Sequence, residues 1–352
     1  MSVVSEGASG RPTPLHELPF AHGGPPLRGT LRSTPEDFFV DEALGFAPDG
    51  AGEHVYLRVE KRGANTDWVA RELARFAGVD PAAVSYAGLK DRHAVTRQTF
   101  SLHLPGKRAE PDWAALGSTE FKVLEAQRNS RKLQRGALES NLFRLVVRNI
   151  DGDRAAAESV LKAIHDTGVP NYFGEQRFGR EAGNVERARA MFAGRRVQRH
   201  ERSLLLSAAR SHLFNLVLAE RVRRGRWNLP LDGDVWTLSG TQSIFGPEPL
   251  TEDLIARNSS GDISPTGAMW GEGPLRTTGE VLAIETAIAS AHPDLIEGLE
   301  KNGLKQARRS LRLLAADLRF NWTEGGDLEL EFRLNSGSYA TVILRELVGG
   351  TA

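Results

Sequence analysis

The amino-acid sequence predicts an α+β protein whose antiparallel sheet is built from both ends of the chain. Strand patterns dominate the first part, helical patterns dominate the middle, and strand patterns return near the end. A sheet domain interrupted by a second, inserted domain accommodates this order most simply. With 352 residues and 40% hydrophobic content, the chain is large enough to bury more than one core.

The strand predictions rest on alternation of apolar and polar residues. Val55, Leu57 and Val59 alternate with polar neighbours, as expected for a half-buried strand of an antiparallel sheet. The segment from Leu328 to Leu334 shows the same alternation late in the chain. The predicted strands cover residues 36–40, 54–59, 121–124, 143–147 and 328–334.

Helices are predicted where apolar residues recur every three to four positions and capping residues flank them. Asn65 or Thr66 can begin a helix that carries Val69 and Leu73 on one face and ends at Gly78. Further helices are predicted at residues 154–164, 185–192, 204–222, 282–288 and 304–314. The inserted domain therefore spans roughly residues 167–315, and residues 1–27, rich in Gly, Pro and Ser, form a flexible lead-in.

Composition and missing motifs exclude several classes of function. The chain has no cysteine, which rules out disulfides, thiol nucleophiles and cysteine-ligated zinc. It contains no phosphate-binding loop of the G-x-x-x-x-G-K-[ST] type, no histidine spacing typical of a catalytic metal and no G-x-S-x-G elbow. We therefore expect no metal and no nucleotide cofactor. Lacking a signal pattern and a long apolar run, the protein is expected in the cytoplasm, without a membrane partner.

Net charge is zero, yet the basic residues are gathered in two stretches. Residues 128–148 hold six cations and one acid, and residues 195–226 hold nine arginines and two acids. Arginine forks suit phosphate recognition, so these stretches point to a nucleic-acid partner. Each stretch taken singly could equally be a solvated face.

The segment Ala87–Gln98 is the strongest candidate for catalysis. A glycine turn presents Asp91 with Lys90 and Arg92 on either side and His93 beyond. Nearby cations hold an aspartate ionised, and an ionised, fixed aspartate can act as nucleophile or base.

Three further clusters combine polar and aromatic residues. Asn141 can hydrogen-bond to the Watson–Crick edge of a base, and Phe143 can stack on a base. Alternatively, Asn141 is an ordinary turn residue and Phe143 is a core residue of a strand. The loop at residues 168–179 could bind single-stranded RNA or serve as a packed hinge between domains. Residues 335–347 are predicted to form the end of a strand, a turn and a helix, with the aromatic ring of Tyr339 exposed.

Together these motifs resemble the tRNA pseudouridine synthase D (TruD) family over nearly all of the chain after the lead-in. The combination is specific, whereas each motif alone is weak. The motifs are Thr34–Phe38, Gly88–Thr96, Gly136–Leu138 with Asn141 and Phe143, Gly168–Gly179, Leu206–Arg210 with Phe214 and Asn215, and Gly337–Thr341.

The resemblance implies isomerisation of a uridine in tRNA to pseudouridine, expected at uridine 13 in the D-arm, without a cofactor. It implies a pseudouridine-synthase-type catalytic domain with a mixed, largely antiparallel sheet, interrupted by an α/β TRUD domain that begins near Thr167. The catalytic domain would comprise residues 28–166 and 316–352, and the TRUD domain residues 167–315. We further expect a monomer with tRNA as its partner.

The same resemblance assigns roles to individual residues. Asp91 matches the catalytic aspartate, Phe38 and Asn141 match substrate contacts, and Phe143 matches the aromatic residue that stacks under the target base. Tyr339 stands where the family commonly has Phe. It keeps the ring and adds a hydroxyl.

Two basic residues complete the predicted setting of the aspartate. Arg32 lies where the family often has Lys, as a cation partner for Asp91, and Lys90 adjoins it. The sequence leaves open whether the carboxylate attacks C1′, attacks C6 or removes the proton at C2′.

The sequence is compatible with two other functions. An RNA-binding or chaperone protein could keep the same basic and aromatic clusters without catalysis. A glycoside or nucleoside hydrolase would need a second carboxylate, for which Glu36 and Asp37 are available.

Overall fold

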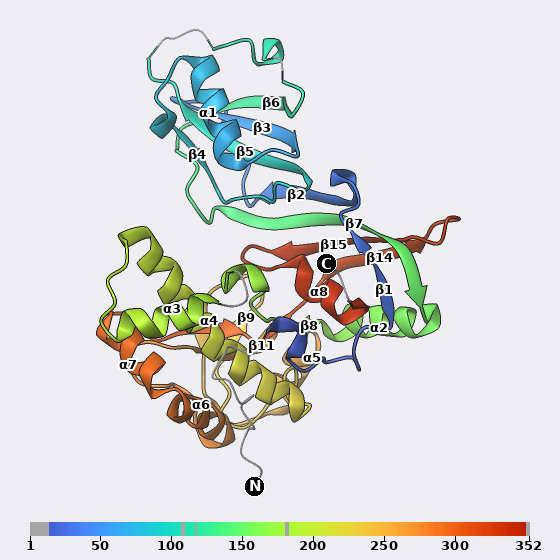
Figure 1. Cartoon of the computed structure of the whole chain (residues 1–352), viewed down its shortest axis with the longest axis vertical. Coiled ribbons are helices and arrows are strands. Elements are labelled where there is room, and N and C mark those ends of the chain that lie inside the picture. Colours follow the sequence, from blue (N-terminus) through green and yellow to red (C-terminus); the bar gives the residue numbers. More distant parts are fainter. Residues whose placement is uncertain (1–13, 107–109, 117, 180–182, 350–352) are drawn as a thin grey trace. The chain divides into compact units, whose positions relative to one another are not determined.

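In the computed structural model, strands from both ends of the chain join in one ten-stranded sheet (Figure 1). The structure describes residues 14–106, 110–116, 118–179 and 183–349. The strands of this sheet are β1 (Leu27–Leu31), β2 (Phe38–Leu44), β3 (His54–Arg62), β4 (Val84–Tyr86), β5 (Val95–His103), β6 (Phe121–Asn129), β7 (Leu138–Gly152), β14 (Ala316–Trp322), β15 (Leu328–Asn335) and β16 (Val348–Gly349).

The sheet is mixed and largely antiparallel, as predicted. Its main path runs β14-β15-β7-β2-β5-β3-β6, with β1 beside β7 and β16 and with β4 beside β5. Only β1 with β16 and β2 with β5 pair in parallel among these strands. Strand β7 is the longest, at 15 residues, and it pairs with β1, β2 and β15 along its length.

The chain divides into two compact units. Of the described residues, the sheet unit comprises those within 26–154, 315–338 and 348–349. The helical unit comprises residues 14–25, the described residues within 155–314, and residues 339–347. The predicted division into a catalytic domain (residues 28–166 and 316–352) and a TRUD domain (residues 167–315) stays a prediction.

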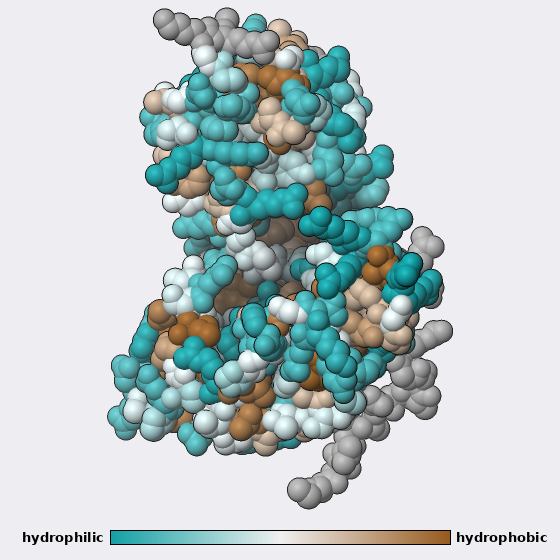
Figure 2. Space-filling model, turned by 90° about the vertical axis from the view of Figure 1, so that its left-hand side faces the viewer, coloured by the Kyte–Doolittle hydropathy of each residue, from teal (hydrophilic) through white to brown (hydrophobic). Residues whose placement is uncertain are grey.

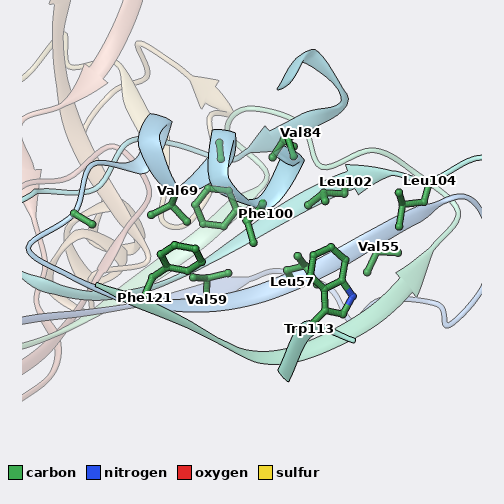
Figure 3. Close-up of a cluster of buried hydrophobic side chains, with 14 residues drawn as sticks. Val55, Leu57, Val59, Val69, Val84, Phe100, Leu102, Leu104, Trp113 and Phe121 are labelled. Carbon is green, nitrogen blue, oxygen red and sulfur yellow. The ribbon is translucent and has the colours of Figure 1, made fainter. Parts of the chain in front are cut away.

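The core of the sheet unit lies between the sheet and helix α1 (Thr66–Ala77) (Figure 3). Val55, Leu57 and Val59 of β3 are fully buried against Leu73 of this helix, as the alternating pattern predicts. Burying side chains of this size contributes roughly 1.5–3 kcal/mol each. The helix ends where predicted, at Gly78, whose left-handed backbone (φ +63°) suits glycine.

The first predicted strand begins later than expected. Residues 35–37 form a 3₁₀ turn, and β2 starts only at Phe38. Pro35 lacks the N–H that a strand would use, and Thr34 and Asp37 cap the turn reciprocally. The alternation of this segment therefore belongs to residues 38–44 and not to 36–40.

The helical unit packs its helices around a four-stranded sheet of order β10-β9-β11-β12 and a two-stranded pair, β13 with β8. Its helices are α2 (Arg154–Thr167), α3 (Gly183–Phe192), α4 (Arg199–Arg223), α5 (Glu252–Ser259), α6 (Gly279–Ala291), α7 (Pro293–Lys301) and α8 (Ala340–Leu347). Its strands are β8 (Val169–Pro170), β9 (Trp236–Leu238), β10 (Ile244–Phe245), β11 (Ile263–Met269), β12 (Ala307–Ser310) and β13 (Arg312–Leu313).

The helix predicted at residues 304–314 is wrong. This segment forms β12 and β13, which pair with β11 and β8. Leu311 and Leu313 are buried, and Arg308 and Arg312 make buried polar contacts that a helix would not place on these partners. Pairing with β8, which lies more than a hundred residues earlier in the sequence, overrides the local helical pattern.

The predicted lead-in is only partly described. Residues 1–13 lie outside the described residues, whereas from Pro14 onward the chain is packed. Leu18 is 2% exposed, and the main-chain N–H groups of Ala21 and His22 donate to Glu346 Oε2 at 3.0 and 3.2 Å. Residues 14–22 are therefore ordered against α8.

The described helices include none that is long and apolar enough to cross a membrane. The surface visible in Figure 2 is mainly hydrophilic, with hydrophobic side chains in separate small patches.

Candidate active site

The predicted site residues of the sheet unit gather on one face of the sheet. On β2, Phe38 and Glu42 lie on the same face, because successive side chains of a strand alternate between the two faces and these residues are four positions apart. On β7, Asn141 and Phe143 do the same, and the register sets Asn141 opposite Glu42. Strand order and register thus bring together residues that are about a hundred positions apart in the sequence.

Asp91 lies in the loop between β4 and β5, near this face. Its Oδ2 accepts an ion-paired contact from Arg32 Nη2 at 2.8 Å, and its Oδ1 accepts a hydrogen bond from the His93 main-chain N–H at 3.0 Å. The side chain remains 26% exposed. Asp91 is therefore an oriented carboxylate, beside a cation, that solvent or a ligand can still reach.

Arg32 is held from two sides. It follows β1 and adopts a left-handed backbone (φ +57°), which costs a non-glycine residue about 1–2 kcal/mol. Its guanidinium lies 4.2 Å above the centre of the Phe38 ring, a cation–π contact. The structure confirms that Arg32 contacts Asp91, and strained backbone of this kind concentrates at functional sites.

Lys90 does not neutralise Asp91, contrary to our expectation from the sequence. Its Nζ lies 2.7 Å from Glu42 Oε2, and the two side chains are 9% and 0% exposed. The other oxygen of Glu42 accepts the Thr99 main-chain N–H at 3.2 Å. Lys90 is thus committed to a buried ion pair, and a direct role of Lys90 in RNA binding stays a prediction.

Arg92 and His93 also differ from the sequence expectation. The Arg92 Nε donates to the Gly63 carbonyl oxygen at 3.3 Å, and His93 reaches Asp91 through its main chain. Neither side chain is a described ion-pair partner of Asp91, so Arg32 supplies the charge.

Lys61 of β3 fixes the main chain of the Asp91 loop. It is fully buried, and its Nζ donates to the carbonyl oxygens of Ala64 at 2.8 Å and Asp91 at 2.9 Å. Burial lowers the pKa of Lys61 to about 8, although the charge of Asp91 acts in the opposite direction. A buried lysine therefore sits immediately behind the candidate catalytic residue.

A hydrogen-bond relay fixes the beginning of the same loop. Thr66 Oγ1 accepts the main-chain N–H of Lys90 at 3.1 Å and donates to Gln98 Oε1 at 3.0 Å. Gln98 Nε2 in turn donates to the Gly88 carbonyl oxygen at 3.3 Å. Helix α1 and strand β5 thereby hold the beginning of the loop.

Three aromatic rings lie on the site face. Phe143 stacks on Phe332 of β15 with ring centres 5.5 Å apart and meets the edge of Phe38 at 6.2 Å. Phe143 is 7% exposed, so it is a strand core residue in this structure. Beside it, Asn141 Oδ1 is buried without a described hydrogen-bond partner, which is an uncommon state for a buried amide.

Tyr339 belongs to the helical unit, whereas the other predicted site residues belong to the sheet unit. Its hydroxyl oxygen accepts a hydrogen bond from Arg177 Nη2 at 3.0 Å. Its participation in a common site with Asp91 stays a prediction.

The acids offered for a two-carboxylate hydrolase are committed elsewhere. Burial raises the pKa of Asp37, but hydrogen bonds from Arg148 and Thr34 and the charge of Arg148 together outweigh this effect, and the pKa is lowered. The hydrogen bond from Arg62 likewise lowers the pKa of exposed Glu36. Neither carboxyl group is suited to donate a proton near neutral pH.

Glu42 and Lys61 were not identified by sequence reasoning. Each looks like an ordinary charged residue within a strand, and the contacts that matter here, with Lys90 and with the Asp91 main chain, come from another part of the sequence. Among the described residues, no group of three or more acidic or histidine side chains could hold a metal ion.

Comparisons with known proteins extend this picture. The family model described as tRNA pseudouridine synthase D (TruD) matches residues 17–188 and 184–347. The chain belongs to the TruD family. TruD proteins are pseudouridine synthases, a class of isomerase.

Similar TruD proteins cover almost the full length of this chain. The tRNA pseudouridine synthase D of Xanthomonas axonopodis pv. citri (strain 306) is 50% identical over 347 residues, which is 94% of each chain. That of Methylococcus capsulatus (strain Bath) is 49% identical over 334 residues and covers the same shares. The fold resembles the crystal structure of a TruD protein from Methanosarcina mazei, with a TM-score of 0.70, 22% identity, and coverage of 95% and 96% of the two chains.

Proposed function

We propose that this protein converts uridine 13 in the D-arm of tRNA to pseudouridine, with Asp91 as the catalytic carboxylate. Isomerisation of uridine in tRNA is the activity of the TruD family, to which the chain belongs. The observation that supports Asp91 is its 2.8 Å pair with Arg32, combined with continued exposure of the carboxylate.

The proposed reaction needs only groups that the site offers. The N1–C1′ bond breaks, the uracil turns and C5 joins C1′, so that N1 gains a proton and C5 loses one. Asp91 would attack C1′ or C6, or remove the C2′ proton. Each route requires a positioned carboxylate, and Arg32 and the His93 N–H hold the Asp91 carboxylate by binding both of its oxygens.

The target uridine must leave its stack before it reacts. Flipping costs roughly a few kcal/mol, and stacking on an aromatic side chain returns about 1–3 kcal/mol per base. Phe143 would provide that surface once its ring is uncovered, and the unpartnered Oδ1 of Asn141 would accept from the base edge. Phe38 would keep Arg32 in place during this exchange.

The test is a nucleotide-resolution map of pseudouridine in tRNA after incubation with wild type, Asp91→Asn and Asp41→Asn. Asp41 pairs with Arg58 at 2.5 Å on the opposite face of the sheet, so it is a matched control for loss of one carboxylate. We expect modification at position 13 by wild type and Asp41→Asn, and none by Asp91→Asn, with tRNA binding retained by all three.

Turnover by purified Asp91→Asn would exclude Asp91 as the catalytic residue. Modification at another position would retain the enzyme class and refute the assignment of uridine 13. Release of free uracil in place of pseudouridine would favour the hydrolase, and binding without any modified nucleotide would favour the RNA chaperone.

A further inference from the structure

Two arginines of the helical unit share one aromatic ring. The guanidinium carbon of Arg309, on β12, lies 4.2 Å from the centre of the Phe173 ring, and that of Arg177 lies 5.3 Å from it. Asn215 of α4 fixes Phe173, since its side chain bonds both the N–H and the C=O of that residue at 2.9 and 3.0 Å. The ring is therefore a rigid platform for both cations.

Neutral groups alone accept hydrogen bonds from these cations among the described residues. Arg309 Nη2 donates to Asn171 Oδ1 at 2.7 Å, and Arg177 donates to Ser207 Oγ at 2.8 Å and to Tyr339 Oη at 3.0 Å. No described carboxylate lies within ion-pair distance of either guanidinium. The Nε atoms of both arginines are buried without a described partner.

Two arginines that share one ring, and not the absence of an acid alone, set this cluster apart. Arg221 pairs with Asp234 at 2.9 Å and Arg308 pairs with Glu285 at 2.8 Å. Arg210 and Arg312, however, also donate only to neutral acceptors in the part of the chain that the structure describes. A positive charge with little access to water and no acid beside it is unfavourable, and here two such charges lie against the same ring. Burial lowers the pKa of Arg309 to about 10, which still leaves it charged at neutral pH.

The neighbouring hydroxyls increase the number of free donors. Ser207 and Tyr339 accept from Arg177, so their own O–H hydrogens remain available for another acceptor. Arg177, Arg309, Ser207 and Tyr339 are each only partly buried, so a ligand can reach the group. A partly exposed site rich in donors, with two cations and no acid, selects an anion with several acceptor oxygens.

We propose that Arg177 and Arg309, with the hydroxyls of Ser207 and Tyr339, bind a phosphate group of the RNA backbone. The inference rests on the proposed function, because tRNA supplies the phosphodiester. Guanidinium forks match phosphate oxygens in geometry, and the Phe173 ring restricts both forks before binding. The site would therefore fix the register of the tRNA without reading its sequence.

The test compares the salt dependence of tRNA binding by wild type, Arg309→Gln and Arg177→Gln. Each lost phosphate contact should reduce the slope of log affinity against log salt by about 0.7–0.9. Affinity at low salt should fall about tenfold, as expected for one charge-assisted hydrogen bond. Arg309→Lys, which keeps the charge, should retain the slope.

Arg257→Gln is the matched control. It removes one positive charge from the same unit, but Arg257 is already paired with Asp262 at 2.6 Å and lies outside both basic stretches. The slope of log affinity against log salt for this variant should equal that of wild type. Unchanged slopes in folded Arg177→Gln and Arg309→Gln would overturn the phosphate site, and so would an equal loss in Arg257→Gln.

Two further results separate the possible failures. Wild type that neither binds nor modifies tRNA would refute the proposed function, whereas wild type that does both with unchanged Gln variants would refute only this site. Inorganic phosphate serves as the probe for a free anion. If it raises the Tm of wild type but not of Arg309→Gln, while tRNA slopes are equal, the site binds free phosphate and the RNA assignment is wrong.

Ethylation of individual tRNA phosphates gives a positional test. Ethylation at one or two positions should weaken binding by wild type, and this sensitivity should disappear in Arg309→Gln. If ethylation weakens tRNA binding by Arg309→Gln as much as it weakens binding by wild type, the assignment is contradicted.

Discussion

The Asp91 site of the sheet unit and the Phe173 cluster of the helical unit differ in how their charges are partnered. At the first, both carboxylates are paired with cations of the protein, Asp91 with Arg32 and Glu42 with Lys90. Around Phe173, Arg177 and Arg309 meet only neutral acceptors among the described residues. Internal pairing fixes the geometry that a reaction needs, whereas unpaired cations keep their attraction for a charged ligand.

The largest expected effect comes from breaking the buried pair of the sheet unit. Glu42→Ala leaves Lys90 charged and buried without its partner, which should lower the free energy of unfolding by about 3–5 kcal/mol. Urea denaturation measures this loss. Glu36→Gln, which breaks the exposed pair with Arg62, should change stability little. A small effect of Glu42→Ala would show that the pair does not stabilise this unit.

The next effect concerns Lys61, whose burial cost depends on pH. The folded protein releases the Lys61 proton near pH 8, whereas an unfolded lysine keeps it to about 10.5. Between these values the unfolded chain binds more protons, so stability should rise with pH. Relative to Lys61→Met, wild type should gain up to about 3 kcal/mol across this window and nothing below it. Parallel stability curves for the two proteins would contradict the lowered pKa.

Removing the cation beside Asp91 should impair catalysis more than binding. Arg32→Ala frees the carboxylate from its 2.8 Å contact, and misplacement of a catalytic group by about 1 Å can cost roughly 100-fold in rate. We expect a fall of that size in single-turnover kcat with an almost unchanged Kd for tRNA. Arg32→Lys should restore most of the rate, and Arg58→Ala, on the opposite face, should have no effect. An equal loss in Arg32→Lys would indicate that charge is not what Arg32 supplies.

The smallest effect is expected from Tyr339→Phe, which removes one hydroxyl from the helical-unit cluster. The proposed phosphate keeps both guanidinium partners in this variant, so the loss of one neutral hydroxyl donor corresponds to a few-fold change. We expect KM for tRNA to rise about threefold and kcat to stay constant. A fall in kcat alone would instead place the hydroxyl close to the reacting base.

Local patterns were sufficient to predict much of the fold. The caps of α1, the alternation in β15 and the glycine turn before Asp91 are all encoded within a dozen neighbouring residues. Resemblance to the family then placed Arg32 beside Asp91, a contact between residues 59 positions apart that the structure confirms.

Contacts distant in sequence were harder to predict. Residues 304–314 carry apolar spacing that suits a helix as well as a strand, and the choice is made by β11 and β8. Glu42 has no neighbour in sequence that reveals its burial, because Lys90 arrives from another strand connection. The unpaired state of Arg309 is likewise visible only once the residues around it are placed.

The length of β7 has a consequence for how this architecture can vary. The strand hydrogen-bonds to β15 from residue 140 to 147, and β15 also pairs with β14. The chain therefore leaves the sheet after β7 and re-enters it at β14, with β15 between these two strands. None of the ten strands comes from residues 155–314. The entropy of closing the intervening segment grows only slowly with its length. The segment can therefore lengthen, shorten or be exchanged in evolution while the sheet and the Asp91 loop stay intact.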